Sequence, residues 1–276
     1  NRANYGTVSW LGIANVPLRR HLMEGFARPY GDTGSFLADP TFEAVFGWTP
    51  SLSRMGDLSG NLLTPSVVDA MDSPPADLVG EYRFGKDRSP YVHQLESWQI
   101  LAEETANSLI VTSGTGSGKT ECFMVPILDR LAREQEKLGC QLVGIRALFL
   151  YPLNALINSQ RDRLRAWTHG FGNKVRFCLY NGLTPETLPA GAIVRGGCEV
   201  QDRRTLRSSP PPVLVTNATM LEYMLVRTQD ADILEKSKGK LEWIVLDEAH
   251  TYVGSQAAEL ALLIRRVIHA FGVTSE

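Results

Sequence analysis

One stretch constrains the fold of this chain more than any other: a glycine-rich turn between an apolar run and a segment with helical spacing. The apolar run covers residues 108–112, the turn is Ser113-Gly-Thr-Gly-Ser-Gly-Lys-Thr120, and residues 121–134 are compatible with a helix. Glycines let the backbone curl so that its N–H groups face inward, beside the N-terminus of the following helix. A strand, a glycine turn and a helix in this order are typical of a phosphate-binding P-loop.

The turn assigns a role to each of its side chains. Lys119 is placed to reach the terminal phosphates of a nucleotide, and the Thr120 hydroxyl is placed to hold Mg²⁺. A glycine turn of another α/β protein is the alternative, although Gly-Lys-Thr directly after an apolar run argues against it. The first position is Ser113, where the pattern has glycine. The cofactor-binding residues predicted here are Gly114, Thr115, Gly116, Ser117, Gly118, Lys119 and Thr120.

Composition narrows the class of protein. The 276 residues carry a net charge of -2, so no global positive field indicates a nucleic-acid partner, although backbone amides can still hold a strand locally. The four cysteines are widely spaced, which predicts free thiols in a reducing compartment and no zinc site. No apolar run is long enough to cross a membrane and no signal peptide opens the chain, so we expect a cytoplasmic protein without a membrane partner.

Two regions differ in pattern. Residues 1–83 contain short helical segments broken by glycine and proline, and we interpret them as a helical accessory region whose Trp10, Phe26, Phe36, Phe46 and Trp48 are core packing. Residues 84–276 alternate helices with short apolar strands, which predicts a parallel sheet with helices on both faces. The predicted strands are 108–112, 145–150, 175–179, 213–216 and 243–246, and the predicted helices are 92–104, 121–134, 157–167, 219–226 and 256–271.

A second chemical motif, Asp247-Glu248-Ala249-His250, follows the last predicted strand. Ligands of such sheets bind at the carboxyl ends of strands, where the glycine turn also lies. Asp247 is placed to bind the metal's coordination shell, and Glu248 to orient or deprotonate an attacking water. Acidic residues often follow strands without any such role, but together with the P-loop they indicate nucleotide hydrolysis.

The P-loop and the Asp-Glu-Ala-His motif resemble those of the first RecA-like domain of a superfamily 2 helicase of the DEAH or DExH type. The resemblance covers residues 84–276 and implies a RecA-like fold that uses ATP and Mg²⁺. His93-Gln94 is similar to the family's Q motif, in which the glutamine reads adenine, so that role transfers to Gln94. His250 is implied to link the nucleotide to the nucleic-acid site, with strand-end packing as the alternative.

Two further motifs imply a nucleic-acid partner. The segment Tyr151-Pro-Leu-Asn154-Ala-Leu resembles motif Ia, and Thr216-Asn217-Ala-Thr-Met-Leu resembles motif Ib. In the family these loops hold the sugar-phosphate backbone, so the resemblance implies contacts from Tyr151, Asn154, Thr216 and Asn217. Such contacts give sequence-independent, salt-sensitive binding.

The short sequence segments in and around these motifs are similar to those of the MrfA/YprA group of bacterial DNA helicases and of large antiphage helicases such as Druantia DruE. They include Tyr180-Asn-Gly-Leu-Thr-Pro185 and Arg265-Arg266. This resemblance implies DNA as the nucleic acid, movement from 3′ to 5′, a role in antiphage defence and partner proteins from such a system. A cluster of arginines at 195, 203, 204 and 207 is interpreted as solvated surface charge rather than a nucleic-acid rim.

The family also implies what lies outside these residues. The chain starts with Asn1, and its motifs end before motif III, so we expect a longer protein with a second RecA-like domain that supplies an arginine finger. We therefore expect the fragment to bind Mg-ATP and to hydrolyse it very poorly. A nucleotide-dependent nucleic-acid clamp or scaffold that does not unwind is the alternative, and another kind of P-loop NTPase is disfavoured by motifs Ia and Ib.

Overall fold

The structure is a computed structural model that describes residues 8–10, 12–36, 47–103, 108–114, 116–189, 191 and 197–274. Thr115, Arg195 and Phe46 therefore lie outside the described residues. The chain divides into two compact units, Asn1–Gly47 and Trp48–Glu276. In the smaller unit, α2 (Val16–Ala27) begins after Asn15, whose side chain accepts the N–H of Leu18.

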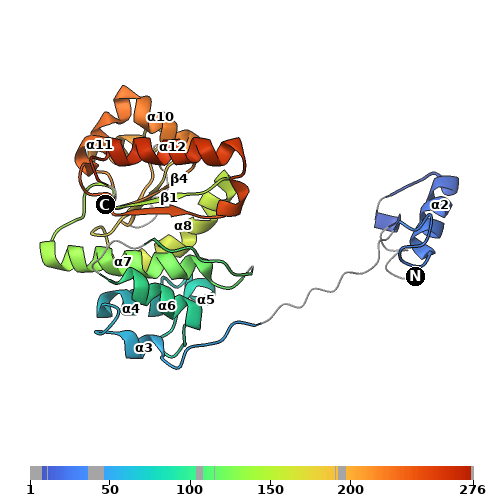
Figure 1. Cartoon of the computed structure of the whole chain (residues 1–276), viewed down its shortest axis with the longest axis horizontal. Coiled ribbons are helices and arrows are strands. Elements are labelled where there is room, and N and C mark those ends of the chain that lie inside the picture. Colours follow the sequence, from blue (N-terminus) through green and yellow to red (C-terminus); the bar gives the residue numbers. More distant parts are fainter. Residues whose placement is uncertain are drawn as a thin grey trace. The chain divides into compact units, whose positions relative to one another are not determined.

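The larger unit is built on a parallel sheet with the strand order β3-β2-β4-β1-β5. The strands are β1 (Ala147–Leu150), β2 (Phe177–Leu179), β3 (Glu199–Val200), β4 (Val213–Thr216) and β5 (Trp243–Leu246). Every residue of β1, β2 and β4 is buried, which explains why these strands are nearly continuous apolar runs. The predicted α/β class with helices on both faces is confirmed (Figure 1).

One face of the sheet is covered by α7 (Lys119–Leu138) and α8 (Asn154–Thr168), with smaller helices packed outside them. Alternate strand residues point to this face, so Phe149 packs with Met124 of α7 and Trp167 of α8 in one core. The outer elements are α3 (Met55–Leu58), α4 (Pro65–Asp72), α5 (Val79–Tyr82), α6 (Val92–Leu101) and η1 (His169–Phe171).

The opposite face carries the later helices. Leu148 and Leu214 point to this side and pack with Leu221 and Leu263 in a second core. The helices here are α9 (Arg203–Ser208), α10 (Ala218–Val226), η2 (Thr228–Asp230), α11 (Ala231–Ser237) and α12 (Ser255–Ala270), whereas η3 (Ala249–Thr251) follows the carboxyl end of β5. Figure 1 shows α10, α11 and α12 together on this side of the sheet, away from α4 to α7.

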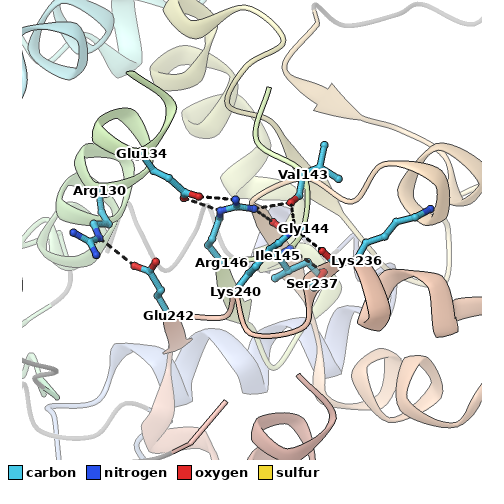
Figure 2. A network of polar contacts seen from close by, with 10 residues as sticks. All are labelled: Arg130, Glu134, Val143, Gly144, Ile145, Arg146, Lys236, Ser237, Lys240 and Glu242. Carbon is cyan, nitrogen blue, oxygen red and sulfur yellow. Dashed lines mark hydrogen bonds and ion pairs between the residues drawn. The ribbon is translucent and has the colours of Figure 1, made fainter. Parts of the chain in front are cut away.

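A polar network at the amino ends of the strands anchors the far half of α7 (Figure 2). The buried guanidinium of Arg146 forms two hydrogen bonds to Glu134 of α7 and donates to the carbonyls of Val143 and Gly144. Arg130 of α7 pairs with Glu242, the residue before β5, at 3.2 Å. Helix α7 is therefore tied to the segments that enter β1 and β5.

The structure departs from the sequence interpretation in several places. Residues 108–112 are not part of a strand in the described chain, because a strand needs a hydrogen-bonded neighbour and none of the described strands pairs with this run. Among the described strands, β5 pairs with β1 alone. Strand β3 and helices α9 and α11 were not predicted.

Residues 48–83 were assigned to the accessory region, yet they belong to the larger unit. Met55, Val68 and Met71 are fully buried in the same core as α7 and α8. The N–H of Thr64, which precedes α4, donates to Asp129 of α7. The division between compact units therefore lies at Gly47–Trp48 and not at residue 83.

Candidate functional site

The glycine turn leads directly into α7, as a phosphate-binding turn requires. Gly116 and Gly118 have φ values of 77° and 75°, in the left-handed region that favours glycine. The Lys119 ammonium donates to the Ser113 carbonyl at 3.0 Å, and the hydroxyls of Ser113 and Ser117 lie 2.5 Å apart. The Ser113 carbonyl oxygen accepts the hydrogen bond that Lys119 would donate to a phosphate oxygen. The side chains of the turn therefore suit a phosphate group.

Helix α6 supports this turn through three side chains. His93 Nε2 lies 2.9 Å from the Ser117 carbonyl oxygen, and Gln94 Nε2 donates to the Gly118 carbonyl at 3.1 Å. The indole N–H of Trp98 donates to the carbonyl of Glu121 in the first turn of α7 at 2.9 Å. The sequence pointed to Gln94 as a contact of the base, but neither His93 nor Trp98 was assigned a role.

Gln94 itself is almost fully buried, with 2% of its surface exposed. Its side-chain oxygen accepts the N–H of Tyr91 at 2.9 Å, and its side-chain nitrogen makes the bond to Gly118. Both ends of the amide are therefore engaged by the protein backbone. In this structure Gln94 joins the start of α6 to the phosphate-binding turn.

The acidic motif follows β5 at the carboxyl end of the sheet. Glu248 has φ 51°, the one positive value among the described residues other than glycine. Asp247 Oδ1 accepts the N–H of Glu248 at 2.9 Å, and the N–H of Asp247 donates to the Leu150 carbonyl of β1. The Glu248 carboxylate lies 3.3 Å from His250 Nδ1, and His250 is mostly exposed. Both carboxylates thus remain half-buried at the strand end.

Tyr151 was predicted to contact nucleic acid, but its side chain is 1% exposed and belongs to the core. Burial first, and then the nearby carboxylate of Asp247, raises the pKa of Tyr151 well above its ordinary value. The side chain is therefore sheltered directly after β1, and its burial does not allow direct contact with a strand on the surface. Thr216 is also buried, and its hydroxyl donates to the Tyr180 carbonyl at 2.6 Å.

Two of the predicted nucleic-acid residues do meet at the surface. Asn217 Nδ2 donates to Asn154 Oδ1 at 2.8 Å. Asn154 is the first residue of α8, and Asn217 caps α10 by accepting the N–H of Met220. Two helix N-termini, whose first N–H groups have no partner within the helix, are thus brought to one place beside the exposed amide of Asn154 and the half-buried amide of Asn217.

The arginine cluster was interpreted as solvated charge, and for two of its members that is wrong. Arg203 donates to the Thr184 carbonyl at 2.8 Å, and its guanidinium lies 5.3 Å from the centre of the Tyr180 ring. Arg207 pairs with the fully buried Asp230 at 2.8 Å, and Asp230 also accepts the Tyr180 hydroxyl at 2.9 Å. The one local signal was Asp202, whose side chain caps α9. Helix α9 therefore fixes the loop that follows β2.

Protein side chains alone do not form a metal site among the described residues. Within the part of the chain that the structure describes, no three His, Cys, Asp or Glu side chains are grouped as a metal site. Oxygen donors from Thr120 and Asp247 suit Mg²⁺, which usually keeps phosphate and water ligands as well. Across the described residues, no helix combines the length and apolar character that a membrane crossing requires.

Comparison with known proteins agrees with the site. The Druantia protein DruE of Escherichia coli (strain UMEA 4076-1) is 29% identical over 72% of this chain and 16% of its own length. The uncharacterized ATP-dependent helicase YprA of Bacillus subtilis (strain 168) is 28% identical over 64% of this chain and 20% of its own length. The chain thus spans a fifth or less of these relatives.

A crystal structure of the DUF1998 helicase MrfA bound to DNA is similar, with a TM-score of 0.54. It is 24% identical, covers 79% of this chain and is matched over 26% of its own length, which shows a shared fold. The pattern described as "DEAD/DEAH box helicase" matches residues 91–274, a range that includes the glycine turn, both surface amides and the acidic motif. This chain therefore belongs to the DEAD/DEAH box helicase family.

Proposed function

We propose that this chain is the ATP-binding lobe of an ATP-dependent helicase or translocase that moves along DNA. The observation that carries the proposal is the shared edge of one sheet: Lys119 folded into its turn, Asp247 and Glu248 after β5, and two helix N-termini beside Asn154 and Asn217. The first two features suit nucleotide hydrolysis, and the third suits a phosphate backbone.

Each residue of the nucleotide site has a defined task. Lys119 exchanges the Ser113 carbonyl for phosphate oxygens, and the N–H groups of the glycine turn donate to the same anion. Thr120 and Asp247 would hold Mg²⁺, which neutralises charge on the phosphates when bound. Glu248 accepts the proton of an attacking water or orients it, and its half-buried position keeps the carboxylate accessible.

A physical link between the nucleotide and nucleic-acid sites supports a motor. Tyr151 opens the motif Ia loop, three residues before α8, and its buried ring lies near Asp247. The N–H of Asp247 also bonds to Leu150, the residue before Tyr151. A movement of Asp247 on nucleotide binding would therefore shift the loop that precedes α8. His250, exposed next to Glu248, is placed to extend this link toward a second lobe.

The nucleic acid is proposed to lie across Asn154 and Asn217 through its phosphates, without reading sequence. DNA is favoured because the MrfA structure has DNA bound. Similarity to DruE supports a role in antiphage defence, with partner proteins of such a system. We propose a cytoplasmic protein in which the compact unit Trp48–Glu276 carries the ATP-binding domain and a second RecA-like domain completes the site.

The test is steady-state ATP hydrolysis by the longer protein, with and without single-stranded DNA, duplex DNA and RNA. Glu248→Gln and Lys119→Ala are expected to abolish DNA-stimulated hydrolysis. Exposed residues offer matched controls: Glu259→Gln and Lys137→Ala are expected to leave it unchanged. Mg-ATP binding without hydrolysis on any nucleic acid would refute the motor and favour a clamp or scaffold.

A further inference from the structure

A hollow lies on the surface where α10 meets α12, and none of the residues discussed above for nucleotide or nucleic acid takes part in it. Its volume is about 380 Å³, and its lining comprises Leu225 of α10 and Arg265, Arg266, His269 and Ala270 of α12. The sequence marked Arg265-Arg266 only as part of a resemblance and gave the two arginines no role. Both are exposed in the structure.

The hollow is at the amino ends of the strands. Helix α10 starts after Asn217 at the carboxyl end of β4, whereas Leu225 is in its last turn. The N–H of Gly239, in the segment that enters β5, donates to the carbonyl of Phe271 directly after α12 at 2.7 Å. The hollow is therefore at the other end of these helices from Asn217 and from the acidic motif.

The rim of the hollow is positively charged. Residues 260–270 include two arginines and a histidine and no acidic residue, in a chain whose net charge is -2. No described residue forms an ion pair with Arg265, and Arg266 lies 3.6 Å from the exposed Glu222 of α10. A long and exposed ion pair of this kind is weak, so Arg266 is free to turn to another carboxylate.

The helix dipole explains only a part of this charge. Cations in the last turn of a helix offset the partial negative charge of its C-terminus, and the effect is confined to that turn. His269 is the basic residue in the last turn of α12, whereas Arg265 and Arg266 precede that turn. The two arginines therefore require another explanation.

Exposed apolar side chains lie beside these cations. Val226 of α10 is 66% exposed and Leu262 of α12 is 60% exposed. Residues four apart on a helix are neighbours, so Val226 adjoins Glu222 and Leu262 adjoins Arg266, the pair that bridges the two helices. The floor of the hollow adds the half-buried Leu225 and Ala270. Apolar groups gathered around arginines are typical of a protein-binding surface.

Two other occupants fit this surface less well. Both helices end here, and the partial negative charge of their C-termini disfavours a dense row of phosphates. A second copy related by a two-fold axis would place the same arginines opposite each other. An acidic protein segment, in contrast, offers carboxylates to the rim and an apolar side chain to the floor.

We infer that this hollow binds an acidic segment of a partner protein. Its carboxylates pair with Arg265 and Arg266, and one large apolar side chain enters the hollow beside Leu225 and Ala270. The inference is independent of the proposed function, because it uses neither the glycine turn nor the pair Asn154 and Asn217. A partner bound here leaves the carboxyl edge of the sheet free, so it can stay bound while that edge is occupied.

The test uses three fluorescent peptides and this chain in anisotropy titrations. The probe is an amphipathic helical peptide with leucines on one face and glutamates elsewhere. One comparison peptide has lysines in place of the glutamates, and the other has serines in place of the leucines. The probe is expected to bind in the micromolar range, at least about tenfold tighter than either comparison peptide, and to bind more weakly as salt is added.

Variants locate the binding site on the chain. Arg265→Glu should weaken the probe by about tenfold or more, because it reverses a charge on the rim. Ala270→Leu should weaken it without any change of charge, because the larger side chain fills the hollow. Arg204→Glu, the same substitution at an exposed arginine of α9, is the matched control and should bind like wild type. Unfolding curves of the variants show whether each one is folded.

Three results would overturn the inference. The first is equal affinity for all three peptides, or unchanged affinity for the probe in Arg265→Glu. The second is displacement of the probe by single-stranded oligothymidylate whose own binding is lost in Arg265→Glu, which would make this face a nucleic-acid surface. The third is self-association in sedimentation that Arg265→Glu abolishes, which would make a second copy the occupant.

Discussion

Helix α7 lies between two glycines, Gly118 and Gly139, whose surroundings differ. Gly118 precedes its first residue with φ 75°, and Gly139 follows its last residue with φ 68°. A Cβ on Gly139 would meet nothing within 4 Å, whereas a Cβ on Gly118 would collide with the buried amide of Gln94. The two positions share a backbone conformation and differ only in their surroundings.

We therefore predict different outcomes for two alanine substitutions. Gly139→Ala should cost about 1–2 kcal/mol of unfolding free energy, because only the left-handed backbone is strained. Gly118→Ala should cost more and should also weaken Mg-ATP binding, because the collision displaces Gln94 from the turn. Urea unfolding together with ATP titration measures both. Equal effects of the two substitutions on ATP affinity would contradict the supporting role of Gln94.

The glycine turn and the acidic motif could be predicted from sequence because their chemistry lies in consecutive residues. The environments of Gln94, Tyr151 and Trp48 could not be predicted in this way. Gln94 donates a hydrogen bond to Gly118, which lies 24 residues later in the sequence. Trp48 lies beside the turn because the neighbouring Pro50 forms an antiparallel bridge with Tyr91 at the start of α6. A motif gives the type of side chain, whereas burial and hydrogen-bond partners depend on the folded chain.

At the scale of elements, helix α7 connects the nucleotide site to the opposite edge of the sheet. Its first residue is Lys119, and its later turns are held by Arg146 and Glu242 near the amino ends of β1 and β5 (Figure 2). The Arg146 and Glu134 side chains are 6% and 29% exposed, whereas those of Arg130 and Glu242 are 60% and 42% exposed. Only the first pair is sheltered from solvent.

This difference predicts a stability contrast. Arg146→Ala should destabilise the fold by about 3 kcal/mol, because Glu134 and two carbonyls lose their donor in a sheltered place. Arg130→Ala should change the unfolding free energy by less than about 1 kcal/mol, as exposed ion pairs do. Denaturant unfolding of both variants is the measurement, and similar losses would show that Arg146 is not an anchor.

Helix α9 allows a comparison within three neighbouring arginines. Arg207→Ala should cost about 3–5 kcal/mol, since it leaves the buried Asp230 carboxylate without its cation. Arg203→Ala removes the donor to Thr184 and the contact with Tyr180, and a loss of about 1–2 kcal/mol is expected. The exposed Arg204 is the control, with a change within about 0.5 kcal/mol on substitution by alanine. If thermal unfolding shows the same small loss of stability for all three alanine variants, the arginines are solvated surface charge after all.

Strands were predicted correctly where all their residues are buried, and the prediction failed where strand formation depends on a hydrogen-bonded neighbour. The runs of β1, β2 and β4 were recognised because fully buried apolar strands of a parallel sheet are nearly continuous in sequence. Residues 108–112 have the same appearance, yet they have no partner among the described strands. Strand β3 consists of Glu199 and Val200 alone, too short for any periodic signal.

At the scale of the whole molecule, three of the four thiols are sheltered: Cys198 in the core under α7 and α8, Cys178 in the core on the opposite face, and Cys122 in the first turn of α7. Cys122, Cys178 and Cys198 are buried, and burial raises the pKa of each thiol. Cys140 is exposed in the turn after α7. The thiols therefore report on the integrity of both cores.

A thiol-reactive disulfide reagent at about pH 8 should label one cysteine rapidly in the folded chain and all four in denaturant. Cys140→Ser should remove the rapid phase, while Cys178→Ser should leave it unchanged. Rapid labelling of more than one cysteine in the native protein would contradict the burial of the cores.

The edge of β5 away from β1, which no described strand covers, has a consequence for handling these 276 residues in solution. A strand paired on one side leaves a row of free N–H and C=O groups, and such rows join to those of other molecules. The side chains of Ile244, Val245 and Leu246 are half-buried and pack against the two cores, so association through this edge would rest on backbone hydrogen bonds. Because Asp247 follows on the same strand, self-association through this edge would crowd the carboxylates as concentration rises. Dilution should therefore restore access of nucleotide to the site.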